Sequence, residues 1–286
     1  MSILVHDESI TASDGYRLEL KCFEPESTPQ AWLVLLHGIQ SHAGWYEATA
    51  RDLAERGIAV WLPNRRGSGP QAESRGDVSH WRRWMSDVVA SLHAMRAHRW
   101  QRQGAGPVIL GGISWGGRLA SVVAAHRPQL LDGLILLAPG LAPRVGPTML
   151  QRLQLALARR MGVVDHRVDV PLSDPAFFTD DPAWQEFIRH DAFALHKVTT
   201  RFLFANQDLD RELRAAPVQV PTLLLLAGQD RIINNPVTRQ IVSRWSCKSQ
   251  VVEYSDSPHT IEFGPARERM VEDIASWLDR IGPRQD

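Results

Sequence analysis

The sequence is poor in cysteine, has no excess of either charge and contains no long apolar run. Cys22 and Cys247 are its two cysteines among 286 residues, too few for a disulfide framework and without metal-ligand spacing. We therefore expect a reducing compartment, with each cysteine acting as a small buried hydrophobe. Lys plus Arg and Asp plus Glu both number 32, so net charge predicts no nucleic-acid partner and no strong attraction to an anionic membrane.

Targeting and membrane-spanning patterns are lacking as well. No apolar run approaches the roughly 18 residues of a membrane span, which predicts no stable membrane insertion. Residues 1–14 are largely acidic and polar and lack the apolar stretch and cleavage site of a signal peptide. Together these features predict a soluble, cytoplasmic protein.

Short apolar runs recur along the chain, with helix-forming stretches between them. Each run is continuous and ends near Gly, Pro or a polar residue, which is typical of strands buried on both faces of a parallel sheet. The runs span residues 33–36, 58–62, 108–110, 134–137 and 223–226. An alternating segment at 16–23 predicts the second arm of an N-terminal hairpin. With a last strand at 250–254 and a closing helix at 266–281, the pattern predicts an α/β fold with a mostly parallel sheet flanked by helices.

The spacing of the strands is interrupted once. No buried-strand run occurs between Pro139 and Val220, although amphipathic stretches do. We predict that residues 1–140 and 217–286 form the core. Residues 141–216 would be a helical cap inserted over the carboxyl edge of the sheet, where ligands bind in open α/β sheets.

Within the predicted cap, four apolar residues recur at helical spacing: Leu150, Leu153, Leu157 and Met161. They fit either a lid that faces lipid or a helix face packed on the cap or core. We favour packing, and leave transient contact with a lipid surface as the alternative. We likewise interpret five aromatic residues as the core of the cap rather than an acyl tunnel: Phe177, Phe178, Trp184, Phe187 and Phe193.

A serine between two glycines is the most informative motif. Ser114 lies in Gly112-Ile113-Ser114-Trp115-Gly116, after the 108–110 strand and before a helix-forming run. This context is typical of a nucleophile elbow, a strained strand-to-helix turn that exposes the serine Oγ and requires small neighbours. We predict Ser114 as a nucleophile.

A serine nucleophile needs a base, and the base needs a group that orients it. Enzymes with this elbow place the acid and then the histidine after the serine in the chain. Asp230 directly follows the 223–228 segment, and His259 lies in the loop between the last strand and the last helix. We predict His259 as the base and Asp230 as the orienting acid. Asp256 is the alternative acid, but its position three residues before His259 favours a turn.

The tetrahedral intermediate of acyl transfer carries a negative oxygen that N–H donors must stabilise. We predict two backbone donors: the amide of Trp115, next to the nucleophile, and the amide of Ile39, which follows His37-Gly38 at a strand end. The chemistry requires no metal and no organic cofactor.

These motifs together resemble the group of α/β hydrolases that contains monoacylglycerol lipases, lysophospholipases and serine aminopeptidases. The resemblance rests on the segment 11–18, on His37-Gly38-Ile39-Gln40-Ser41-His42, on the turn 64–69, on the elbow and on the loops of Asp230 and His259. It implies an α/β-hydrolase fold and cleavage of an acyl bond through an acyl-enzyme. Asn64 replaces a usual aspartate, and Trp115 stands where methionine is frequent, which predicts a differently shaped acyl pocket.

Three function classes follow from this pattern. We favour hydrolysis of a small acyl ester such as a monoacylglycerol or a lysophospholipid. The same triad would serve a peptidase, thioesterase or lactonase; an aminopeptidase should need an acidic cluster, for which the cap offers Asp174, Asp180, Asp181 and Glu186. A non-catalytic binding protein of the same fold is the third class, and an intact triad pattern disfavours it.

Overall fold

The computed structural model describes residues 2–70, 72–245 and 248–282, and an eight-stranded sheet forms its centre. The strands lie in the order β1-β2-β4-β3-β5-β6-β9-β10. Only β1–β2 and β2–β4 pair antiparallel in this sheet; the other neighbours are parallel. The strands are β1 (Ile3–Thr11), β2 (Arg17–Pro25), β3 (Ala31–Leu36), β4 (Ile58–Pro63), β5 (Val108–Ile113), β6 (Gly133–Leu137), β9 (Thr222–Ala227) and β10 (Ser249–Tyr254). Every predicted strand is present, and the predicted fold class is confirmed.

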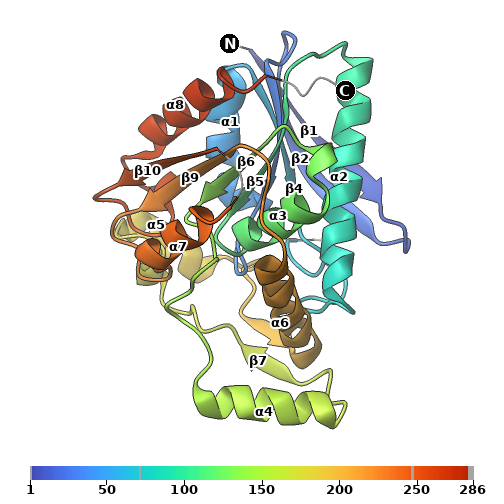
Figure 1. Cartoon of the computed structure of the whole chain (residues 1–286), viewed down its shortest axis with the longest axis vertical. Coiled ribbons are helices and arrows are strands. Elements are labelled where there is room, and N and C mark those ends of the chain that lie inside the picture. The colour runs from blue at the N-terminus through green and yellow to red at the C-terminus, as the bar shows by residue number, and fades with distance from the viewer. Residues whose placement is uncertain (1, 71, 246–247, 283–286) are drawn as a thin grey trace.

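Helices cover both faces of this sheet (Figure 1). On one face α1 packs beside α8, and on the other α2 packs on α3. The continuous apolar runs explain this arrangement, because every residue is buried in five of the six inner strands: β3, β4, β5, β6 and β9. The α-helices of residues 1–140 and 217–286 are α1 (Glu47–Glu55), α2 (Trp81–Gln101), α3 (Trp115–His126), α7 (Asn235–Val242) and α8 (Arg267–Leu278).

Residues 141–216 contribute no strand to the eight-stranded sheet. They form α4 (Met149–Arg160), α5 (Pro182–His190), α6 (Thr200–Ala215) and a small antiparallel pair, β7 (Arg167–Asp169) with β8 (Lys197–Thr199). The sequence analysis missed this pair, because strands of three residues carry too little periodicity to recognise. The division into a core and a separately acting cap stays a prediction.

Helix α4 corrects one interpretation. Figure 1 shows it at the bottom of the view, beyond β7 and away from the main sheet. Its apolar stripe is open to solvent: Leu150 is 65% exposed, Leu153 68% and Leu157 56%. The interpretation that this stripe packs on the cap or core was therefore wrong. Helical periodicity identified the face but could not identify what covers it.

Two further features predicted from the sequence are the state of the cysteines and the lack of a membrane-spanning helix. Cys22 is a buried free thiol, as predicted, whereas Cys247 lies outside the described residues. Among the helices of the described segments, none combines the length and apolar character needed to cross a bilayer.

Strand register places the carboxyl ends of four strands side by side. Leu36 pairs with Gly112, Ile113 with Leu137, and Leu137 with Leu225. The residues that follow these strands therefore emerge at one edge of the sheet. Three of the loops at this edge contain Ile39, Ser114 and Asp230.

Helix α3 begins in backbone contact with the end of β3. A Cβ placed on Gly116 would lie 2.5 Å from the carbonyl oxygens of both Leu36 and His37, closer than atoms can approach without backbone movement. Gly116 is thus required for the close approach of the helix to the strand.

We predict that Gly116→Ala destabilises the protein by about 1–3 kcal/mol, because the added methyl group overpacks a site bounded by backbone. The measurement is the urea midpoint of unfolding. Gly146→Ala is the matched control, since a Cβ on Gly146 meets nothing within 4 Å. Equal midpoints for the two variants would contradict the contact.

Candidate active site

Ser114 occupies a strained turn between β5 and α3. Its φ of 53° lies in the left-handed region, which costs free energy for a residue with a side chain. The turn is held by its own backbone: Ser114 N–H donates to Leu137 O at 3.0 Å, and Ser114 O accepts from the amides of Gly117 and Gly140. The geometry is that of the predicted elbow.

Asp230 and His259 meet although 29 residues separate them. His259 Nδ1 lies 2.8 Å from Asp230 Oδ2, and both side chains are buried. The other oxygen, Oδ1, accepts from the amides of Ile232 and Ile233 at 2.8 and 2.9 Å. Because a carboxylate can only accept, Nδ1 is the protonated ring nitrogen, and Nε2 is the acceptor of the neutral ring. The alternative acid, Asp256, does not hold this position.

The free side of the histidine has no protein partner. Within the described residues, His259 Nε2 is buried and makes no hydrogen bond, so the Ser114–His259 bond is not formed. Hydrogen bonds between a base and the group it deprotonates are often long before substrate binds and tighten only in the complex. Nε2 is thus left available to accept a proton.

The loop after β3 brings the Ile39 amide close to the serine. A Cβ built on Gly38 would lie 3.5 Å from Ser114 Cβ, so this backbone runs directly beside the nucleophile. The second predicted donor, the amide of Trp115, belongs to the first residue of α3 and therefore has no acceptor within the helix. Both amides lie in segments that border Ser114, as the motif predicts.

A buried polar cluster ties the same loop to the 141–216 segment. Asp191 accepts from the side chains of His42 at 3.1 Å and Trp45 at 2.6 Å, and from the amide of Phe193 at 2.9 Å. Burial alone would raise the pKa of Asp191, but the hydrogen bonds from His42 and Trp45 outweigh it and lower the pKa to about 2. Asp191 therefore stays ionised at neutral pH. Sequence reasoning missed this contact, because 149 residues separate Asp191 from His42.

Aromatic side chains from the same segment surround the histidine loop. Phe178 contacts the ring of His259, with centroids 6.1 Å apart, and Trp184 stacks on Phe263 at 4.0 Å. Phe178 is buried, whereas Phe187 and Phe193 are 40% and 43% exposed and so do not form a buried core as interpreted. That Phe178 belongs to the core of a cap stays a prediction.

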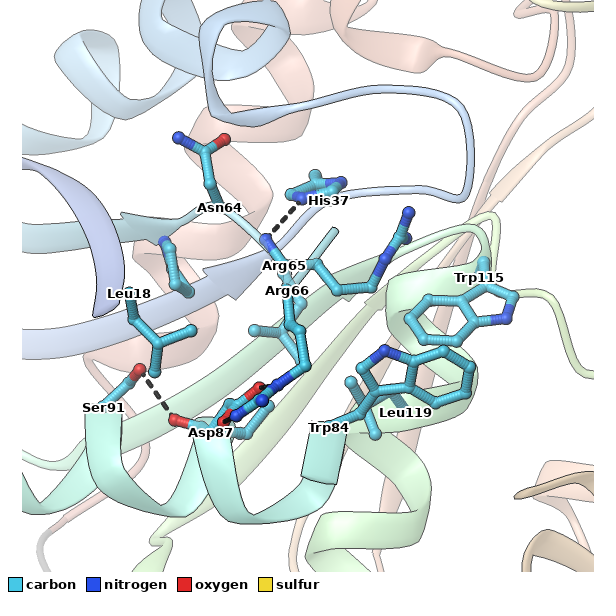
Figure 2. Close-up of a pocket in the computed structure, with 13 residues that line it drawn as sticks. Leu18, His37, Asn64, Arg65, Arg66, Trp84, Asp87, Ser91, Trp115 and Leu119 are labelled. Atoms are coloured by element: carbon cyan, nitrogen blue, oxygen red, sulfur yellow. Dashed lines mark hydrogen bonds and ion pairs between the residues drawn. The ribbon is translucent and has the colours of Figure 1, made fainter. Parts of the chain in front are cut away.

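The indole of Trp115 lies in the core. It packs edge-on against Trp84, with centroids 4.8 Å apart, and its Nε1 donates to Asn206 Oδ1 at 2.7 Å. Both indoles line a small, mainly apolar cavity of about 30 Å³ (Figure 2). Its lining includes His37 and Arg65 but none of the three predicted triad residues. The cavity thus borders the end of β3 and His37 rather than the three predicted triad residues.

Glu262 is an unexpected buried acid near the histidine. It is 3% exposed, and among the described residues its Oε1 has no hydrogen-bond partner. Burial raises its pKa to about 7, partly opposed by a backbone hydrogen bond and by charge on His259. Nothing in the sequence distinguishes it from a surface glutamate in the same loop.

Residues 27–265 match the family model described as serine aminopeptidase, S33. The chain belongs to this family. The match confirms the resemblance inferred from the motifs, and it makes the chain a hydrolase. Where metal ions are concerned, the residues that the structure describes include no group of three or more His, Cys, Asp or Glu side chains able to hold one.

Relatives in this family include named lipases. A monoacylglycerol lipase of Mycolicibacterium smegmatis is 24% identical over 95% of this chain and 96% of its own length. Among solved structures, a monoacylglycerol lipase of Paleococcus ferrophilus covers 98% of this chain and 100% of its own, with a TM-score of 0.77 and 20% identity. A monoglyceride lipase variant of Saccharomyces cerevisiae, solved with a substrate analog, covers 99% and 97%, with a TM-score of 0.82 and 14% identity. At these identities the structural matches establish the fold.

The buried Glu262 predicts a pH-dependent stability. Burial raises the pKa of the Glu262 carboxyl from 4.5 to about 7 in the folded protein. The folded state is therefore most stable below the unfolded pKa, where the carboxyl is neutral in both states, and it loses stability as pH rises through the folded pKa. Glu262→Gln removes this loss, so between pH 5 and pH 8 the variant should gain up to about 3 kcal/mol relative to wild type.

Urea unfolding at both pH values measures the effect. Glu55→Gln, at an exposed position at the end of α1, is the control and should follow wild type. A constant difference between Glu262→Gln and wild type across the pH range would refute the buried, neutral carboxyl.

Proposed function

We propose that this chain is a serine hydrolase that cleaves a carboxylic ester through an acyl-enzyme, with a monoacylglycerol, a lysophospholipid or a similar small acyl ester as substrate. The observations that carry the proposal are the Asp230–His259 bond, which fixes the proton on Nδ1 and leaves Nε2 as an acceptor, and the strained turn at Ser114. The named lipases among the relatives support the acyl ester as substrate.

The proposed reaction has two halves. His259 Nε2 takes the Ser114 proton as Oγ attacks the carbonyl carbon, and then gives it to the leaving alcohol as the ester bond breaks. Water, deprotonated by the same nitrogen, hydrolyses the acyl-enzyme and releases the acid. Asp230 holds the imidazolium, and the amides of Ile39 and Trp115 stabilise the negative oxygen in both halves.

The competing aminopeptidase function has the family's name in its favour, but the four cap acids that the sequence offers for it have other partners. A free N-terminus requires unpaired acid, yet Asp174 and Asp181 accept from the backbone as helix caps. Asp180 pairs with Arg231, and Glu186 pairs with Arg189. All four candidate acids are therefore engaged elsewhere, and this favours the ester.

The first test is the nucleophile itself. A fluorophosphonate probe should label wild type, and Ser114→Ala should abolish labelling and reduce kcat for ester hydrolysis by roughly 10⁴-fold or more. Ser243→Ala, which alters an exposed serine at the end of α7, should retain both activities. No labelling of folded wild type would instead favour a non-catalytic binding protein.

An assay of the purified wild-type protein on esters and amides tests which bond is cleaved. p-Nitrophenyl esters of several chain lengths and a monoacylglycerol should be hydrolysed, whereas amino-acid p-nitroanilides should not. Faster cleavage of the anilides would establish the peptidase.

We further propose that α4 contacts a lipid surface transiently and thereby brings the enzyme to its acyl substrate. Four large apolar side chains on α4 are 56–81% exposed, and Met161, which directly follows the helix, is 68% exposed. Arg152 and Arg160 on the same helix are exposed and would face anionic headgroups. A helix with this arrangement can bury its apolar face in a bilayer interface without crossing it.

The expected result concerns binding to vesicles of phosphatidylcholine with anionic phosphatidylglycerol. Leu153→Glu/Leu157→Glu should weaken co-sedimentation roughly tenfold or more, because each leucine contributes about 1.5–3 kcal/mol on burial. Hydrolysis of a dissolved short-chain ester should be unchanged. Leu4→Glu/Trp100→Glu alters two exposed apolar residues on other elements and should bind as wild type does. Equal binding by both double variants would exclude α4 as the contact.

A further inference from the structure

One buried arginine holds the loop that carries the Ile39 amide. Arg65 Nη1 donates to Gly38 O at 3.0 Å, and Nη2 donates to Ile39 O at 2.8 Å and to Ser68 Oγ at 2.7 Å. A single planar guanidinium thus binds two consecutive carbonyls of the oxyanion loop. Such a two-point grip fixes the orientation of a backbone segment as well as its position.

The same carbonyl has a second donor. His37 Nδ1 lies 2.8 Å from Gly38 O, and His37 Nε2 accepts from the Arg65 amide at 2.9 Å. Burial, reinforced by the charge of Arg65, holds the pKa of His37 well below its usual range. The ring is therefore neutral, with its proton on Nδ1. Two donors converge on Gly38 O and pull it toward Arg65.

The direction of the Ile39 N–H follows from peptide geometry. A trans peptide is planar, so the C=O of Gly38 and the N–H of Ile39 point in opposite directions. Since the carbonyl points at Arg65 and His37, the N–H points to the other side of the loop. The loop passes Ser114 at this point, since a Cβ built on Gly38 would lie 3.5 Å from Ser114 Cβ, and a carbonyl oxygen reacting at Ser114 would therefore lie near this N–H.

Arg65 is itself fixed by the core. Its guanidinium lies 4.7 Å from the centroid of the Trp115 ring and 5.7 Å from that of Phe202. Figure 2 shows Arg65 extending toward Trp115, while its neighbour Arg66 turns toward Asp87. Although burial lowers the pKa of Arg65 to about 9, the group stays charged at neutral pH. One side chain therefore contacts both residues whose amides would form the oxyanion hole.

We propose that Arg65 is a positioning residue for the oxyanion hole: by binding the carbonyls of Gly38 and Ile39 it aims the Ile39 N–H at the oxygen that becomes negative during acyl transfer. The proposal rests on the proposed ester hydrolysis. It predicts that loss of the guanidinium lowers transition-state stabilisation and leaves ground-state binding of the ester intact.

The test compares Arg65→Met, Arg65→Lys and Arg66→Lys with wild type. Active sites are counted by fluorophosphonate titration, so that misfolded protein does not contribute. Arg65→Met should lower kcat on a p-nitrophenyl ester roughly 100-fold, the effect expected for one lost oxyanion donor, with KM within about twofold. Arg65→Lys should lose roughly tenfold, because a single ammonium cannot hold two carbonyls at once. Arg66→Lys weakens the two-point contacts with Asp14 and Asp87 but leaves the contacts of Arg65 in place, so its kcat per active site should match wild type.

A second readout separates positioning from a merely structural role. A trifluoromethyl ketone forms a tetrahedral adduct with a negative oxygen, so its Ki should weaken in the Arg65 variants by the same factor as kcat/KM. An unchanged kcat in both Arg65 variants would overturn the inference, as would a reduced kcat with an unchanged Ki. If wild type neither hydrolyses esters nor reacts with the fluorophosphonate, the proposed function itself fails, which is a different outcome.

Discussion

The close approach of two backbones, the first turn of α3 and the end of β3, determines where every other part of the site lies. Gly116 permits this approach, because its α-carbon faces the carbonyl oxygens of Leu36 and His37 at a distance that excludes any side chain. The strained Ser114 and the loop of Ile39 thereby become neighbours. Strain at the serine, a φ of 53°, persists because the surrounding sheet and helix leave the turn no alternative conformation.

Much of this arrangement could be predicted from local sequence. Continuous apolar runs identified five of the six inner strands, because both faces of those strands are buried. The sixth, β2, was recognisable by its alternating pattern. The elbow around Ser114 was recognisable since a sharp turn demands small residues at fixed positions. The pairing of Asp230 with His259 followed from chain order and strand ends, and the structure places these two side chains in hydrogen-bond contact.

The rest could not be predicted, for a common physical reason. Contacts between distant segments depend on which faces are covered, and periodicity does not encode that. The apolar stripe of α4 has the spacing of a packed face yet is exposed, and Glu262 has the composition of a surface residue yet is buried. The hydrogen bonds from His42 and Trp45 to Asp191 join the segment 141–216, in which no motif was recognised, to a loop that the sequence identifies by motif.

The hydrogen bonds to Asp191 connect the segment 141–216 with the loop after β3. The loop from His37 to Tyr46 carries the Ile39 amide at one end and donates to Asp191 from the other. A change in the 141–216 segment that displaces Asp191 would leave an ionised carboxylate without donors, which is costly in a buried site. The segment that would shape the acyl pocket and the loop that would stabilise the oxyanion are therefore held by one set of hydrogen bonds. A substitution that moves Asp191 would therefore disturb both, whereas the exposed face of α4 shares none of these bonds and can contact a lipid surface without disturbing them.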